Sequence, residues 1–336
     1  MRKFHTILSI FFIAVLFSGC GTKRQYFEPE KVTSKVDFEY KLPDNIASTS
    51  LNGAVLENGM VITKDGLLPE NIKFPKNTLL LNFHKDKFIT STLDGNLAIT
   101  DKTGGIVYEK KFNEAIVSAS LEDNRLATLS SSNTIRLINI TTDSILLEFE
   151  SSNVYAQDSR VAAPYFLSSL VIFPTLDGKI MIVDKSNGRI LRDVVVSSEE
   201  FFNNIIFLDV INDTMIASTG KRIVSISPEK TLYYNGEIKN VISNKDKIYI
   251  FEKDGKVILA DLNLQKLNSI NFKFAIFSNA VTFNDHLYII EKKGYLIKTR
   301  LDLSDPQIFE LNDEIKDKSF VGFKDFYYDN HYLKLN

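Results

Sequence analysis

Short segments in which apolar and polar residues alternate recur along most of the chain, and this pattern predicts β-strands. In LDGKIMIVDKSNGRIL (176–191), Ile180 and Ile182 alternate with Lys179 and Met181 before a polar turn and a second apolar stretch. Alternation with a period of two is typical of a half-buried strand. Asp, Ser, Asn and Gly are residues that tight turns favour. The segment therefore predicts a β-hairpin.

Close copies of this hairpin occur at several places in the chain. DGNLAITDKTGGIVYE (94–109) aligns without a gap on DGKIMIVDKSNGRILR (177–192), and DGKVILADLNLQKLNS (254–269) fits the same frame. The shared turn residues are Asp94, Gly95, Asp101, Gly105, Asp177, Gly178, Asp184, Gly188, Asp254, Gly255 and Asp261. Weaker copies make seven in all, at spacings of roughly 35 to 45 residues, and they lie at 58–72, 132–147, 220–234 and 293–308. Repetition of this kind is typical of repeat folds.

The repeated turn residues are interpreted as structural. Glycine after aspartate adopts a positive φ without steric cost. Aspartates such as Asp101, Asp184 and Asp261 can cap backbone N–H groups within a turn. Because the same residue types return in copy after copy, they predict turns rather than a catalytic set.

A second kind of hairpin lies between successive copies and after the last one, at 77–93, 115–131, 205–219, 240–253, 280–293 and 321–336. The region 168–176, which an insertion precedes, makes seven in all. One hairpin of each kind makes a four-stranded unit of about 40 residues, which is the size of a β-propeller blade. The sequence therefore predicts an all-β propeller over residues 46–336. The count favours seven blades, with 321–336 pairing with 58–77 so that the N- and C-terminal strands close the ring. Eight blades are expected if 46–57 or 153–167 contribute strands.

The N-terminus has the pattern of an export signal. Arg2 and Lys3 precede an apolar stretch that is too short to span a bilayer. The stretch ends in Phe17-Ser18-Gly19-Cys20, which resembles the lipobox of bacterial lipoproteins. This resemblance implies a signal peptide over 1–19, cleavage between Gly19 and Cys20, and attachment of fatty-acyl chains such as palmitate to Cys20. Residues 20–45 are polar and without pattern, which predicts a flexible tether.

Composition narrows the possible chemistry. The net charge of −2 gives no sign of the basic surface that nucleic-acid binding requires. Cys20 is the only cysteine, so no intramolecular disulfide is expected. The histidines, at positions 5, 84, 286 and 331, are far apart in sequence and form no metal-binding motif. No nucleotide-binding or nucleophile motif occurs, and the sequence predicts neither a cofactor nor a metal site nor an enzyme.

One stretch resembles a known propeller repeat. VAAPYFLSSLVIFPTLDGKIMIVDKSNGRIL (161–191) is similar to the PQQ-like repeat, with Pro164 before the inner hairpin and Asp177-Gly178 before the next strand. That repeat is shared by quinoprotein dehydrogenases and by BamB-like lipoproteins. The dehydrogenases carry repeated tryptophans and a pair of adjacent cysteines beside their cofactor, and this chain has neither. The resemblance therefore implies the BamB-like group, which acts without a cofactor.

The leading hypothesis is a monomeric, lipid-anchored scaffold of the bacterial envelope. By resemblance it assists outer-membrane β-barrel assembly by binding envelope proteins such as the assembly insertase. Gly21 after the cysteine favours the outer membrane by resemblance, with the domain on its periplasmic face. The insertion 154–165 is the expected contact loop. A surface-exposed lipoprotein that binds external ligands, and a quinoprotein-type enzyme, remain alternatives.

Overall fold

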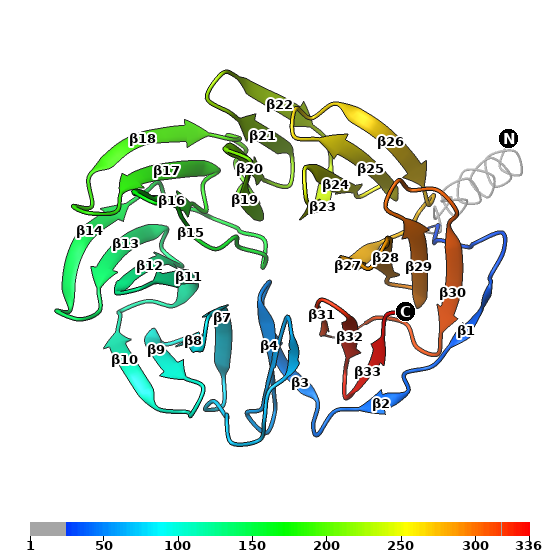
Figure 1. Cartoon of the computed structure of the whole chain (residues 1–336), viewed down its shortest axis with the longest axis horizontal. Helices are drawn as coiled ribbons and strands as arrows, with labels where there is room; N and C mark the ends of the chain where they lie inside the picture. The colour runs from blue at the N-terminus through cyan, green and yellow to red at the C-terminus, as the bar shows by residue number, and fades with distance from the viewer. Residues whose placement is uncertain (1–24, 317) are drawn as a thin grey trace, which may run out of the picture.

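The computed structural model describes residues 25–316 and 318–336. Within these residues all regular elements are β-strands, and they form eight sheets arranged as the blades of a ring (Figure 1). The predicted all-β propeller is therefore confirmed. The favoured count of seven blades was wrong, and the alternative of eight is correct.

The first four blades follow the chain from residue 46. Blade 1 contains β3 (Ile46–Thr49), β4 (Gly53–Leu56), β5 (Val61–Thr63) and β6 (Gly66–Leu67). Blade 2 contains β7 (Thr78–His84), β8 (Lys87–Thr92), β9 (Asn96–Asp101) and β10 (Ile106–Lys111). Blade 3 contains β11 (Ile116–Glu122), β12 (Arg125–Ser130), β13 (Thr134–Asn139) and β14 (Ser144–Glu150). Blade 4 contains β15 (Tyr165–Phe166), β16 (Leu170–Pro174), β17 (Lys179–Asp184) and β18 (Ile190–Val195).

The last four blades complete the ring and take in the N-terminal strands. Blade 5 contains β19 (Phe207–Ile211), β20 (Thr214–Ser218), β21 (Arg222–Ile226) and β22 (Thr231–Asn235). Blade 6 contains β23 (Ile238–Asn244), β24 (Lys247–Glu252), β25 (Lys256–Asp261) and β26 (Lys266–Asn271). Blade 7 contains β27 (Phe277–Phe283), β28 (His286–Glu291), β29 (Tyr295–Arg300), β30 (Gln307–Leu311) and β1 (Ser34–Val36). Blade 8 contains β31 (Ser319–Val321), β32 (Asp325–Tyr328), β33 (His331–Lys334) and β2 (Tyr40–Lys41).

The eighth blade arises because 46–57 form strands. β3 and β4 are the inner hairpin of blade 1, and its outer hairpin, β5 and β6, is the most degenerate part of the repeat. All four residues of β4 are buried, so this strand lacks the alternation that identifies strands elsewhere. The other segment that was considered as a source of extra strands, 153–167, contains only β15.

The ring closes through its two termini, but with different strands from those expected. β2 pairs antiparallel with β33, and the rings of Tyr40 and Tyr332 stack with centroids 4.9 Å apart. The predicted pairing of 321–336 with 58–77 was wrong, because β5 and β6 belong to blade 1. β1 also adds to the outer edge of blade 7 in parallel to β30 (Figure 1). The part of the expected flexible tether between residues 34 and 41 thus includes two strands bound to the ring.

Buried apolar clusters hold the blades together, one at each of the eight junctions. Between blades 5 and 6, for example, Ile216 and Ile223 pack against Ile248 and Ile250. Burying one such side chain contributes roughly 1.5–3 kcal/mol. Because the chain has no Trp, branched aliphatic residues and Phe fill these junctions.

In blades 2, 4 and 6 an Asp-Gly turn is hydrogen-bonded to the connection that follows the blade. Gly95, Gly178 and Gly255 have φ values of 89°, 82° and 94°. Their carbonyl oxygens accept hydrogen bonds from the N–H groups of Phe112, Val196 and Phe272, which lie just beyond the outer strand of the same blade. Glycine is needed because the backbone is left-handed there and the connection passes close by.

The aspartates of the second turn bind their own backbone. Asp101 Oδ1 accepts hydrogen bonds from the N–H groups of Thr103 and Gly105 at 2.8 and 3.0 Å. Asp184 Oδ1 accepts from Ser186 N–H, and Asp261 Oδ1 from Asn263 N–H. Hydrogen bonds from the Thr103 side chain and from the N–H groups of Gly105 and Thr103 lower the pKa of Asp101. The carboxylates therefore fix the turns that join the third and fourth strands.

Replacing Gly255 by Ala should lower the free energy of unfolding by at least about 2 kcal/mol. A Cβ at this position lies 2.0 Å from Phe272 O, and the backbone has φ 94°. Urea unfolding followed by tyrosine fluorescence or circular dichroism measures the change. Gly220→Ala is the matched control, because its Cβ meets no backbone atom closer than 3.8 Å and its cost should stay below about 1 kcal/mol. Equal stability of the two variants contradicts this account of the turn.

Candidate functional site

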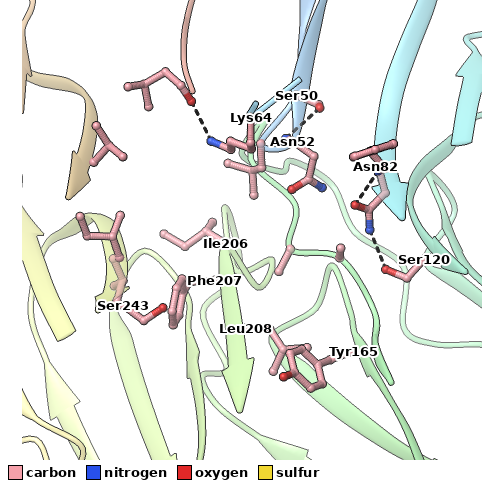
Figure 2. Close-up of a pocket in the computed structure, with 18 of the residues that line it drawn as sticks. Ser50, Asn52, Lys64, Asn82, Ser120, Tyr165, Ile206, Phe207, Leu208 and Ser243 are labelled. Carbon is pink, nitrogen blue, oxygen red and sulfur yellow. Dashed lines mark hydrogen bonds between the residues drawn. The ribbon is translucent and has the colours of Figure 1, made fainter. Parts of the chain in front are cut away.

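A channel of about 740 Å³ opens among the innermost strands of the ring. All eight blades contribute to its wall, so no single repeat contains it. In Figure 2 the side chains that line this space converge on it, and the labelled ones come from blades 1 to 6. The labelled ones are Ser50, Asn52, Lys64, Asn82, Ser120, Tyr165, Ile206, Phe207, Leu208 and Ser243.

The amide side chains of the channel bridge neighbouring blades. Asn52 Nδ2 donates to Leu81 O at 2.8 Å, from blade 1 to blade 2. Asn82 Nδ2 donates to Ala119 O and to Ser120 Oγ, from blade 2 to blade 3 (Figure 2). Because these donors already have protein partners, they stabilise the inner wall.

Lys64 is the cation of the channel wall. It lies in the turn between β5 and β6, and its ammonium donates to Val321 O at 2.9 Å and lies 4.7 Å from the centroid of the Phe320 ring. No carboxylate among the described residues is within ion-pair distance of it. Burial lowers the pKa of Lys64 to about 8. The lysine joins blade 1 to blade 8 where the ring closes.

Two further polar side chains of the wall are those of Glu122 and His84. Glu122 forms an ion pair with Lys185 of the next blade. His84 lies at the end of β7, and its Nε2 atom is buried without a hydrogen-bond partner among the described residues. No group of three His, Cys, Asp or Glu side chains in residues 25–316 and 318–336 is arranged to hold a metal ion.

The predicted contact loop is part of the longest connection between strands in the described chain, residues 151–164 between β14 and β15. The segment leading into β15 runs toward the middle of the ring (Figure 1), and Ala162 and Pro164 line the channel. Asn204 binds the connection in two ways: its Oδ1 accepts from Asp158 N–H at 2.7 Å and its Nδ2 donates to Arg160 O at 2.6 Å. The connection is therefore fixed to the loop between blades 4 and 5.

Three exposed aromatic side chains gather on these two loops, and we call Tyr155, Phe201 and Phe202 the aromatic loop surface. Their exposed fractions are 82%, 50% and 58%. Phe202 N–H donates to Ala156 O at 3.0 Å, which brings the two loops together. Phe202 also has a φ of 54°, an unusual backbone for an aromatic residue. Large exposed apolar side chains on two loops that contact each other make this surface a candidate interaction site.

The structure separates the residues singled out in the sequence. Asp94, Asp177 and Asp254, with the glycines that follow them, lie in the turns between second and third strands. Asp101, Asp184 and Asp261 are the last residues of the third strands, directly before the turns to the fourth strands. Gly188 has a φ of 74°, whereas in the equivalent turn of blade 2 the left-handed residue is Gly104, next to Gly105. None of these residues lines the channel. The predicted cleavage and lipidation site, Gly19 and Cys20, lies outside the described residues.

Asp177 has an additional contact between blades. Its carboxylate accepts from Asn133 Nδ2 of blade 3 at 3.0 Å and from Lys179 Nζ at 2.7 Å. Burial alone raises the pKa of Asp177, but hydrogen bonds from Lys179, Thr175 and Asn133 outweigh it and lower the pKa to about 2. The predicted contact loop includes Tyr155, but sequence reasoning missed Phe201, Phe202, Lys64 and the Asp177 bridge, because the segments that these residues contact are distant in the chain.

Comparison with known proteins gives relatives and a shared fold. No family model matches the chain. The chain is 32% identical over 325 residues to plasminogen-binding protein PgbB of Helicobacter pylori strain J99, and 31% identical over 300 residues to the protein of the same name in strain 26695. These alignments cover 84% and 76% of this chain but only 60% and 55% of the relatives. The crystal structure of BamB from Moraxella catarrhalis superposes with a TM-score of 0.67 at 14% identity, covering 86% of this chain and 94% of that one.

The structural likeness supports the predicted BamB-like propeller fold, and at 14% identity it extends to the fold alone. The chain spans little more than half the length of the curated relatives that it matches. No helix in the described residues is long and apolar enough to cross a membrane.

Replacing Lys64 by Met should change how stability depends on pH. Because burial brings the pKa of Lys64 from 10.5 to about 8, between these values the unfolded chain holds a proton that the folded chain has released. The free energy of unfolding of the natural protein should therefore rise, relative to Lys64→Met, as pH increases from 8 to 10.5, by up to about 3 kcal/mol. Urea titrations at pH 7 and pH 10 measure this.

The matched control is Lys230→Met, an exposed lysine in the turn between β21 and β22. This variant controls for the loss of one lysine charge at the surface. For each variant, the free energy of unfolding is compared with that of the natural protein at pH 7 and at pH 10. If this difference is the same for both variants at both pH values, the assignment of a buried ammonium to Lys64 is wrong.

Proposed function

We propose that this chain is a lipid-anchored propeller of the bacterial envelope that binds a protein partner through the aromatic loop surface and catalyses no reaction. The observation that carries the proposal is the exposure of Tyr155, Phe201 and Phe202 on two loops that are hydrogen-bonded to each other. Aromatic side chains on a fixed support are the groups that dominate binding energy in protein interfaces.

The ring supports this role because it holds the loops rigidly. The insertion is attached at Asn204 and at Ala162, whose carbonyl oxygen accepts from Ser118 Oγ of blade 3 at 2.7 Å. Pre-organised loops lose less conformational entropy when a partner binds.

The relatives named plasminogen-binding protein favour plasminogen as the first partner to test. This choice corresponds to a surface-exposed lipoprotein that binds an external protein. The second candidate is a BamB-like accessory that binds the β-barrel assembly insertase at the periplasmic face of the outer membrane. It is supported by the shared propeller fold and by the lipobox-like sequence that ends in Cys20.

Removing the aromatic loop surface should abolish partner binding without unfolding the ring. In the triple variant Tyr155→Ser, Phe201→Ser, Phe202→Asn, asparagine replaces the left-handed residue because it tolerates positive φ. We expect a fall in affinity of at least 100-fold, since losing one interface anchor costs about 2 kcal/mol or more. Surface plasmon resonance with the full chain in detergent, against purified plasminogen and against the purified periplasmic region of the insertase, measures it.

The control is the double variant Leu93→Ser, Ile106→Ser, which removes two apolar side chains of blade 2 with exposed fractions of 75% and 64%. It should bind as the natural protein does. Binding of plasminogen alone supports surface exposure, and binding of the insertase alone supports the assembly role. If neither partner binds, or if the triple variant binds as well as the control, the proposal fails.

A further inference from the structure

The N-terminal segment is attached to the ring at Phe27, only a few residues after Cys20. The Phe27 side chain is 6% exposed and makes edge-to-face contacts with Phe272 of the loop after blade 6 and Tyr295 of blade 7, with ring centroids 6.1 and 5.5 Å apart. Six residues later Thr33 N–H donates to Ile308 O at 2.7 Å, just before β1 pairs with β30. The chain is therefore fixed to the rim between blades 6 and 7.

This attachment limits the distance between the rim and a lipid on Cys20. A chain extends at most about 3.6 Å per residue, so Phe27 lies within about 25 Å of Cys20. A free tether up to Ile46 has a reach of about 90 Å by the same measure. A bilayer that holds Cys20 must then lie within about 25 Å of Phe27, on the side of the rim between blades 6 and 7.

The side chains at this rim suit a phospholipid surface. Tyr26 is 45% exposed, and Lys293 Nζ lies 4.3 Å from the centroid of its ring. In the loop between blades 6 and 7, Phe274 is 37% exposed, and Lys273 Nζ lies 5.0 Å from its ring. Phe274 has a φ of 67°, so a strained backbone presents its ring to solvent.

Exposed aromatic rings beside lysines are typical of groups that sit at a membrane interface. The rings enter the headgroup region, while the lysine stems lie along apolar surface and keep the ammonium in contact with water or phosphate. Lys293 also pairs with Glu314 at 2.9 Å, so Lys273 is the freer of the two cations. The rim would therefore contact phospholipid mainly through its aromatic rings and less through its net charge.

We propose that the rim formed by Tyr26, Lys273, Phe274 and Lys293 rests on the phospholipid surface in which Cys20 is anchored. The inference rests on the lipid anchor of the proposed function. It orients the ring with blades 6 and 7 toward the bilayer and blades 2 and 3 away from it. The aromatic loop surface, on the loops before and after blade 4, remains clear of the membrane and accessible to a partner.

The test places a fluorescent probe at the rim and at a matched position elsewhere. Because Cys20 is the only cysteine and its thiol is blocked by lipidation, Lys273→Cys and Leu93→Cys each provide one labelling site. Leu93 lies in the turn before β9 of blade 2, is 75% exposed, and is far from the rim around the ring. The lipidated full chain is reconstituted in phosphatidylglycerol–phosphatidylethanolamine vesicles, some of which carry a spin label in the lipid headgroup.

Headgroup quenching at position 273 should exceed that at position 93 by at least fivefold. Equal quenching at the two positions, in protein that mass spectrometry shows to be acylated and that floats with the vesicles, overturns the orientation and leaves the anchor intact. Protein that carries no acyl group on Cys20, and remains in solution, overturns both the anchor and the orientation. Cys20→Ala provides the unlipidated reference for flotation.

Discussion

Closure of the ring is the constraint on which the rest of this structure depends. An all-β protein must cover or pair the edges of its sheets, and a ring of blades also needs a final contact between the last blade and the first. Here that contact combines the β2–β33 pairing, the cluster of Leu42 and Ile46 with Phe320, and the Lys64 ammonium on Val321 O. The charge of Lys64 opposes folding through desolvation, so apolar packing and backbone pairing must supply the net stabilisation.

In the proposed orientation, the same N-terminal segment that closes the ring also sets the distance between the ring and the membrane. Since β2 completes blade 8 and β1 extends blade 7, the chain must run around the rim before it reaches Phe27. A closure made between the C-terminal hairpin and blade 1, as the repeats suggest, leaves residues 20–45 free. If Cys20 is anchored as proposed, the strands that close the ring therefore decide whether the propeller is attached at one rim or through a long flexible segment.

The sequence was informative wherever structure depends on near neighbours. The Asp-Gly positions could be predicted because Gly95 and Gly255 need a positive φ, and the turn aspartates because Asp101 bonds to residues two and four positions ahead. The missed features have no such local signal. The residues of β4 are all buried, β2 is a two-residue strand paired with residues near the C-terminus, and Lys64 meets its carbonyl partner 257 positions away.

The distribution of polar and apolar groups explains why the binding role is assigned to loops rather than to the channel. The amides of Asn52 and Asn82 already bridge blades, so using them for a ligand weakens the inner wall. The Phe202 side chain, by contrast, lies largely in solvent. More than half of its surface is exposed and its backbone is left-handed, at a cost of roughly 1–2 kcal/mol that packing in the core does not offset. This combination of backbone strain and exposure supports the proposal that Phe202 contacts a protein partner.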